Sequence, residues 1–89
     1  MRWDTEEEVL RRANNTDMGL GASVWTKDPE RVRRMVKGIK AGNVWVNSHM
    51  DLQPNATFGG HKQSGVGSEW GLNGLRSYCA TQTVFLAKM

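Results

Sequence analysis

The sequence predicts a small α/β fold with a right-handed βαβ unit, a third helix and a C-terminal strand. Two apolar stretches of strand character, Leu20–Thr26 and Asn43–Asn47, flank a segment whose apolar side chains recur at helical spacing. Short links join these three segments, which favours parallel strands and a right-handed crossover. Residues 48–67 hold a proline and a glycine cluster, so this segment is predicted to be a loop.

The first helix is predicted to run from about Thr5 to Ala13. Thr5 and Glu8 match a capping box, in which the two side chains satisfy free backbone N–H groups at a helix start. The turn-forming run at residues 14–17 ends the helix.

The second helix begins after Asp28, a favourable N-cap residue, with Pro29 in the first helical position. Gly42 is predicted to follow its C-terminal end. One face of this helix is apolar and consists of Val32, Met35, Val36 and Ile39.

The last two elements are a third helix and a final strand. Ser68 is predicted to cap a helix that runs from Glu69 to about Tyr78. The stretch Thr81–Lys88 is predicted to be a strand, because β-branched and aromatic side chains are enriched in it.

Length and composition set the class of protein. A chain of 89 residues forms one domain at most, 1–89, and its apolar fraction of 38% excludes compositional disorder. No apolar run is long enough to cross a bilayer, and no signal-peptide pattern opens the chain, so no membrane partner is expected. The single cysteine, Cys79, excludes an internal disulfide and favours a reducing, cytoplasmic location.

The positive charge is concentrated in one segment. Residues 27–40 carry six lysines and arginines against two acidic residues, which gives +4, whereas the whole chain has a net charge of +3. The basic side chains have no interleaved aromatic residues and lie toward a helix C-terminus, where cations are favourable in any protein. A solvated helix face is therefore predicted, and no nucleic-acid partner.

The stretch Thr57–Gly71 holds five of the ten glycines and looks at first like a phosphate-binding loop. A Walker loop needs a lysine directly before its serine or threonine, but Lys62 precedes Ser64 by two residues. The dinucleotide fingerprint fails too, because its last glycine comes one residue late and no strand leads into it. The glycines are therefore predicted to shape the loop rather than to bind a nucleotide.

No catalytic or metal-binding residue is predicted. Several nucleophiles, bases and acids occur in the loop, but no motif surrounds them, and the two histidines and one cysteine lack ligand spacing. The candidates of this kind are Ser48, Ser64, His49, His61 and Asp51.

Three stretches, "ANNTDMGLGASVWTKD", "AGNVWVN" and "FGGHKQSGVGSEWGLNGL", resemble the C-terminal part of the aldehyde dehydrogenase superfamily. The resemblance covers residues from about Trp3 to Lys88. It implies that 1–89 is part of a catalytic domain and that 81–88 is the last oligomerisation strand. In that family the nucleophile, the general base and the cofactor domain lie upstream of this region.

The resemblance therefore implies a piece of an enzyme that oxidises aldehydes to carboxylic acids, not catalytic on its own. No cofactor is expected in this chain, whereas the parent enzyme would use NAD or NADP. The alternative is a free-standing, non-enzymatic oligomerisation or binding module derived from that family.

Three site residues follow from the resemblance alone. Phe58, in "TFGG", matches the aromatic residue that walls the aldehyde pocket in the family, and Leu52 falls at another pocket-lining position. Glu69 matches a glutamate proposed to relay protons in some members, although a plain acidic residue in the first turn of the third helix is the preferred interpretation here.

The resemblance also implies a homo-oligomer, with a two-fold dimer as the expected form. In the family the strand that matches Thr81–Lys88 pairs with a neighbouring subunit, and an unpaired strand edge favours such pairing on physical grounds. Trp25, Trp45, Val84 and Phe85 are expected to lack their usual cover. The alternative is a monomer in which the last strand lies beside Asn43–Asn47.

Overall fold

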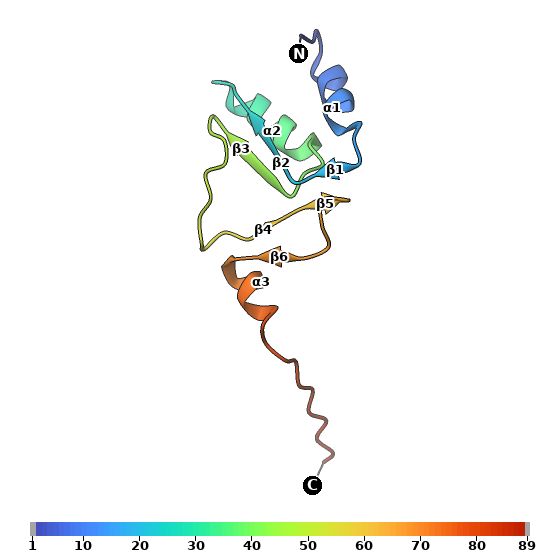
Figure 1. Ribbon diagram of the computed structural model, residues 1–89, viewed down its shortest axis with the longest axis vertical. Helices are drawn as coiled ribbons and strands as arrows, with labels where there is room; N and C mark the ends of the chain where they lie inside the picture. Colours follow the sequence, from blue (N-terminus) through green and yellow to red (C-terminus); the bar gives the residue numbers. More distant parts are fainter. Residues whose placement is uncertain (1, 89) are drawn as a thin grey trace.

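The computed structural model describes residues 2–88 and has three helices and six short strands within them (Figure 1). The elements are α1 (Glu6–Asn14), β1 (Met18–Gly19), β2 (Gly21–Val24), α2 (Pro29–Gly38), β3 (Asn43–Val46), β4 (Phe58–Gly59), β5 (His61–Lys62), β6 (Ser68–Glu69) and α3 (Gly71–Arg76). The molecule measures 67 × 24 × 23 Å, and its long axis ends in the C-terminal segment.

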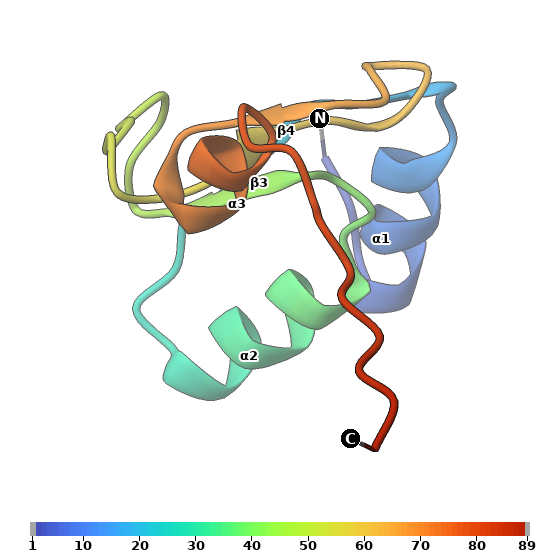
Figure 2. The same cartoon turned by 90° about the horizontal axis from the view of Figure 1, so that it is seen from below.

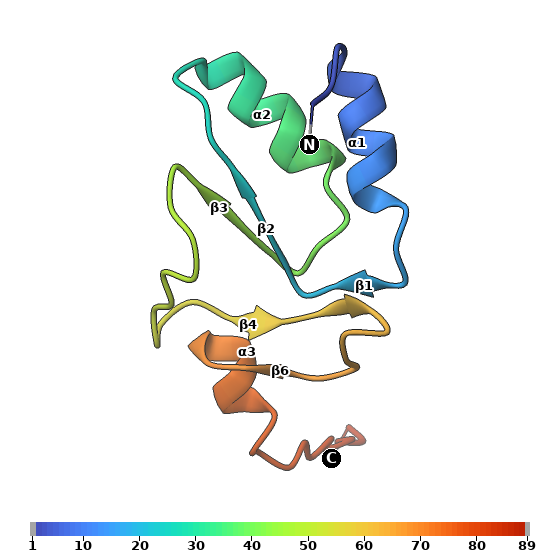
Figure 3. The same ribbon diagram turned by 45° about the horizontal axis from the view of Figure 1, so that its top comes forward.

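The predicted strand–helix–strand unit is present. Strands β2 and β3 pair in parallel, with Gly21 opposite Asn43 and Val24 opposite Val46, and α2 connects them. Helix α2 packs on β2, and α1 packs beside α2 on the same side of the strands (Figures 2 and 3). The observed β2 is shorter than the predicted strand, because the chain bends at Leu20 between β1 and β2.

Helix α1 begins where the sequence predicts. The Glu8 N–H donates to Thr5 Oγ1 over 3.1 Å, so Thr5 is the N-cap. The reciprocal contact differs from a capping box, because the Glu8 carboxylate accepts from the N–H of Asp4, one residue before the cap.

Helix α2 also begins as predicted and ends early. The Asp28 carboxylate accepts from the Glu30 N–H over 2.9 Å, and Pro29 holds the first helical position. The helix ends at Gly38, since Ile39 is extended with ψ of 130°. The prediction that Gly42 follows the helix end is therefore wrong.

The segment predicted to be a loop contains two short strands. Strand β4 pairs antiparallel with β6, and β5 pairs antiparallel with β1. The first pairing joins the two ends of the glycine-rich stretch to each other, and the second joins its middle to the strand that follows α1. Two-residue strands have no periodicity that a sequence could reveal.

The third helix is shorter than predicted. Ser68 does not cap it and Glu69 is not in its first turn, because both residues form β6 opposite Phe58 and Gly59. Trp70 follows with φ of 62° and ψ of 171°, a conformation incompatible with a helix. The helix therefore starts at Gly71.

Residues 80–88 form neither helix nor strand and extend away from the body (Figures 1 and 2). The side chains of Val84, Phe85 and Leu86 are 68%, 91% and 90% exposed. The predicted strand is thus not formed in the single chain, since a strand needs a partner edge and this segment lies beside none in residues 2–88. The folded-back alternative beside β3 is not observed either.

The chain encloses very little of its own apolar surface. Val24, at 6% exposure, is the only buried apolar side chain within residues 2–88, and Trp25 beside it is 68% exposed. Trp45 is half-buried, so its predicted exposure is only partial. Across the same residues, no helix has the length and apolar character that a membrane crossing requires.

Candidate functional site

A cavity of about 260 Å³ lies where β3, the segment 51–57 and the start of β4 meet. Leu52 and Phe58, the two residues that the family resemblance implies as pocket-lining, both border it. Two tryptophans that the sequence did not single out, Trp45 and Trp70, border it as well. The border of the cavity thus includes three aromatic side chains and one leucine, together with smaller and polar residues.

Phe58 and Trp70 form an aromatic pair at this cavity. Their ring centroids are 5.8 Å apart with an angle of 44° between the planes. Tilted arrangements at this distance are favourable for aromatic rings. Phe58 is half-buried and Trp70 is 40% exposed, so both rings remain partly accessible.

Glu69 lies next to this pair but borders a different cavity. It is opposite Phe58 in the β4–β6 register, and its side chain is exposed. The neighbouring cavity, of about 480 Å³, is bordered by Glu69, Phe58 and Tyr78 among others. The structure therefore brings Leu52 and Phe58 to one cavity and leaves Glu69 at the next.

Trp45 holds the chain that follows β3. Its indole N–H donates to the Asp51 carbonyl oxygen over 2.8 Å, and the His49 ring lies edge-on to it with centroids 5.5 Å apart. The Trp45 ring also covers Gly21 on β2, where any Cβ would overlap it. These contacts fix the backbone immediately before Leu52.

The nucleophile and base candidates do not assemble into a triad. His49 Nδ1 lies 2.7 Å from Ser23 Oγ, so it pairs with a serine of β2 rather than with one of the loop. The Asp51 carboxylate accepts from Gln53, and Ser64 Oγ accepts from the Gly19 N–H. The His49–Ser23 pair therefore receives no carboxylate from Asp51.

The Lys62 side chain is hydrogen-bonded to the backbone at the end of α1. Its ammonium donates to the carbonyl oxygens of Asn14 and Thr16, each over 2.9 Å. These carbonyls lie at the helix C-terminus, which carries partial negative charge. The lysine of the glycine-rich stretch thus has a structural partner.

Two glycines hold β4 against the start of β3. A Cβ at Gly42 would overlap the carbonyl oxygen of Gly59, so the two backbones approach as only glycine allows. The Asn43 side-chain amide donates to the same carbonyl over 2.9 Å and to that of Leu20 over 2.8 Å. Both ends of the cavity-forming loop are fixed by these contacts.

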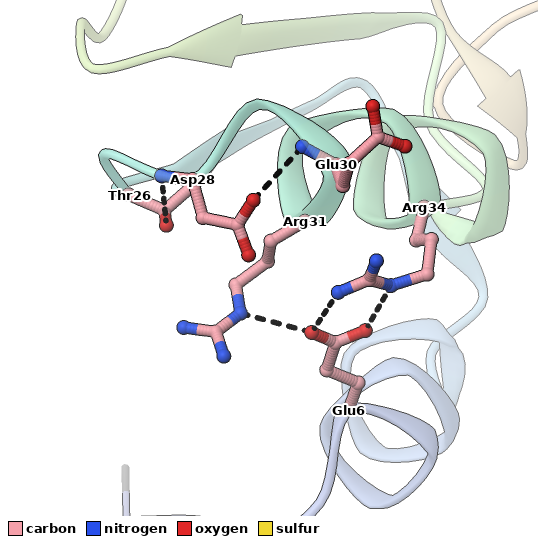
Figure 4. Close-up of polar contacts among 6 residues, drawn as sticks. All are labelled: Glu6, Thr26, Asp28, Glu30, Arg31 and Arg34. Carbon is pink, nitrogen blue, oxygen red and sulfur yellow. Dashed lines mark hydrogen bonds and ion pairs between the residues drawn. The ribbon is translucent and has the colours of Figure 1, made fainter.

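A cluster of charges joins α1 to α2 away from the cavity (Figure 4). The Glu6 carboxylate accepts from Arg34 Nε and Nη2 over 2.8 and 2.9 Å, and from Arg31 Nε over 2.9 Å. These hydrogen bonds, that of Arg34 first, lower the pKa of Glu6 to about 2. Two of the six basic residues of segment 27–40 are thus engaged with α1.

The structure offers no metal site within residues 2–88, where no group of three histidine, cysteine, aspartate or glutamate side chains comes together. Cys79 is exposed, and its thiol lies 3.6 Å from the Leu75 carbonyl oxygen.

Trp45 and Trp70 were missed as cavity residues because their roles depend on distant contacts. The sequence places Trp45 in an apolar strand, where burial in a core is the ordinary expectation. Trp70 directly precedes Gly71, the first residue of α3, and this glycine was the one local sign of irregular backbone there.

The family model described as "Aldehyde dehydrogenase family" matches residues 1–84. The chain is 41% identical over 86 residues to the NADP/NAD-dependent aldehyde dehydrogenase PuuC of Escherichia coli, covering 97% of this chain and 17% of that protein. It is 43% identical over 84 residues to aldehyde dehydrogenase 1 of Tanacetum cinerariifolium, covering 94% of this chain and 17% of the relative.

Among solved structures, the NAD⁺ complex of an aldehyde dehydrogenase from Bacillus cereus superimposes with a TM-score of 0.84 at 42% identity. This match covers 88% of the chain and 16% of that structure. The chain spans less than a fifth of the length of the curated relatives that it matches, from 16% to 19%.

Proposed function

The chain belongs to the aldehyde dehydrogenase family, and we propose that its cavity at Leu52 and Phe58 forms part of an aldehyde-binding pocket. The whole protein would oxidise an aldehyde to a carboxylic acid with NAD or NADP. The observation that carries the proposal is that the two positions matching the family's pocket wall border one cavity.

The residues of this chain do not fit a dinucleotide cofactor. Lys62, the only lysine of the glycine-rich stretch, already donates to two carbonyl oxygens at the end of α1. Contrary to the expectation that no strand leads into the glycines, the two-residue strands β5 and β6 precede Gly65 and Gly71. Neither strand, however, is followed by a glycine loop and a helix N-terminus of the kind that presents N–H groups to a phosphate. This supports the proposal that the cofactor binds elsewhere in the whole protein and that the isolated chain does not oxidise aldehydes.

A graft tests the proposed pocket. The matched 86 residues of PuuC are replaced with the corresponding part of this chain, and reduction of NAD or NADP is followed with a panel of aldehydes. We expect an active enzyme whose KM for aldehyde rises on Phe58→Ala and is unchanged by Val66→Ala, a control at an exposed residue of the same stretch. A soluble, folded graft without activity toward any aldehyde would refute the proposal.

We further propose that the chain associates with a second copy through residues 81–88. The support is physical: Phe85 and Leu86 are almost fully exposed, Val84 is largely exposed, and the segment has unpaired backbone groups. Burying one such side chain is worth about 1.5–3 kcal/mol, so a few suffice for association.

Sedimentation equilibrium tests this association on the intact chain and on a chain ending at Gln82. The intact chain is expected to be a dimer at tens of micromolar and the shortened chain a monomer. A monomeric intact chain would contradict the dimer, and a dimer that persists after shortening would contradict the role of the segment.

A further inference from the structure

Trp70 adopts a backbone conformation that side chains rarely tolerate. Its φ of 62° and ψ of 171° fall in a region populated almost entirely by glycine. Gly71 follows with φ of 61°, so two consecutive residues have positive φ. Strained residues of this kind persist where the surrounding structure holds them in place, and they gather at binding sites.

Within residues 2–88, packing in a core does not explain why a large side chain occupies this strained position. The Trp70 side chain is 40% exposed, and the one aromatic ring in contact with it is that of Phe58, at 5.8 Å, among the described residues. Both rings border the 260 Å³ cavity together with Leu52. The strained backbone thus directs the indole to the border of this cavity.

The cavity has the size for one uncharged aromatic ring. Its border combines apolar side chains with the polar groups of Asn43, Gln53 and Thr57. A cavity of about 150 Å³ is enough to hold benzene, so 260 Å³ leaves room for a short substituent. Among residues 2–88, Asp51 is the only ionisable residue on its border, and neither lysine nor arginine is present there to attract an anion. A flat ring can stack on Phe58 or Trp70 in the offset or tilted arrangements that aromatic pairs prefer.

We infer that Trp70 is a specificity-determining residue, which forms with Phe58 an aromatic wall that favours substrates carrying a neutral aromatic ring over small aliphatic ones. The inference rests on the proposed function for its identification of the ligand as an aldehyde substrate. The wall itself depends only on the geometry of this chain.

Binding to the 89-residue chain is measured first. The ¹⁵N-labelled chain is titrated with benzyl alcohol and, separately, with 1-butanol, and the amide and indole signals are followed. Alcohols are used because aldehydes condense with lysine amines. We expect saturable shifts at Phe58 and at the Trp70 indole with benzyl alcohol, and much weaker binding of 1-butanol. Equal affinity for the two alcohols, or no shift at either residue, would overturn the inference.

Variants then assign the preference to Trp70. Trp70→Leu is expected to weaken benzyl alcohol binding about threefold to tenfold, the range of an aromatic pair, while Trp70→Phe retains most of the affinity. Trp25→Leu is the matched control, because Trp25 is exposed and borders a different cavity. If Trp70→Leu unfolds, the Trp70→Phe variant and the comparison of the two alcohols on the unchanged chain still decide the question.

The PuuC graft separates this inference from the proposed function. In an active graft, Trp70→Leu is expected to lower kcat/KM for benzaldehyde relative to butanal by a similar factor. An unchanged ratio in an active graft contradicts the role of Trp70 and leaves the proposed function intact. An inactive graft contradicts the proposed function, whereas the titration of the chain still decides the aromatic wall.

Discussion

Glu6 and Arg34 form a bidentate ion pair between α1 and α2, with Nε–Oε2 and Nη2–Oε1 distances of 2.8 and 2.9 Å. Arg31 donates to the same carboxylate, so one acidic side chain joins two basic ones (Figure 4). Bidentate pairs of arginine and carboxylate combine charge with fixed geometry. The Asn14 side-chain amide donates to the Gly38 carbonyl oxygen at the C-terminal ends of the same two helices, so this hydrogen bond and the ion pair together fix how the helices dock.

Glu6→Gln is expected to lower the urea midpoint of unfolding, because the amide keeps the shape of the side chain but removes the charge that both arginines contact. The measurement is urea unfolding followed by circular dichroism. Glu7→Gln is the control, since Glu7 is the exposed neighbour on the same helix. Equal midpoints for the two variants would show that the pair contributes nothing to stability.

The free energy of unfolding is expected to decrease as the pH is lowered, because Glu6 becomes protonated. The folded-state pKa is about 2, below the unfolded value of 4.5, so the ionised carboxylate favours the folded state. This contribution is complete above pH 4.5 and is lost as the pH falls toward 2. The difference in free energy of unfolding between the wild-type chain and Glu6→Gln should therefore shrink across this range, and a constant difference would argue against the assignment.

Lys62→Met is expected to destabilise the chain by about 1 kcal/mol, because two carbonyl oxygens at the end of α1 lose a charged donor at an exposed site. Thermal unfolding measures the effect. Lys40→Met provides a control with the same change at another exposed lysine. A loss of NAD affinity in calorimetry, in place of a loss of stability, would mean that Lys62 serves a nucleotide instead.

Gly42→Ala and Gly67→Ala form a matched pair. The new methyl at Gly42 would overlap the Gly59 carbonyl oxygen, whereas at Gly67 no atom lies within 4 Å. Overpacking of this kind costs about 1–3 kcal/mol, so Gly42→Ala should be clearly less stable than the wild-type chain. Gly67→Ala should be close to neutral, and similar urea midpoints for the two variants would contradict the close approach.

Trp70→Gly and Trp70→Ala test the backbone strain at Trp70. Both remove the ring, but only glycine tolerates φ of 62° with ψ of 171°. The glycine variant is therefore expected to be more stable than the alanine variant by about 1–3 kcal/mol. This order is the reverse of the one in a helix or strand, and finding alanine the more stable would show that the conformation is not strained.

Local signals in the sequence were sufficient for the parts of the fold that depend on neighbouring residues. Thr5 and Asp28 both cap helices as predicted, and the parallel pairing of β2 with β3 follows from two apolar stretches and a connecting helix. The start of α3 could not be predicted this way, because Ser68 and Glu69 pair with a strand ten residues earlier.

The residues of the candidate site likewise depend on long-range contacts more than on local signals. Leu52 and Phe58 were found only through resemblance to a family, since neither belongs to a motif with chemistry of its own. Trp45 joins the site through hydrogen bonding to Asp51 and contact with Gly21, and Trp70 through its unusual backbone. Such long-range contacts leave no periodic trace in a sequence.

The close approach of Gly42 to Gly59 allows the loop between β3 and β4 to vary without moving these strands. Because Gly42 and Asn43 at the start of β3 contact the Gly59 carbonyl oxygen at the end of β4, residues 48–57 can change in length or composition while these two strands keep their positions. Doubling a loop costs only about 0.6 kcal/mol in closure entropy, so such variation is thermodynamically mild. A lineage of related proteins can therefore alter the shape of this cavity by substitution or insertion between two glycines, without having to evolve a new scaffold.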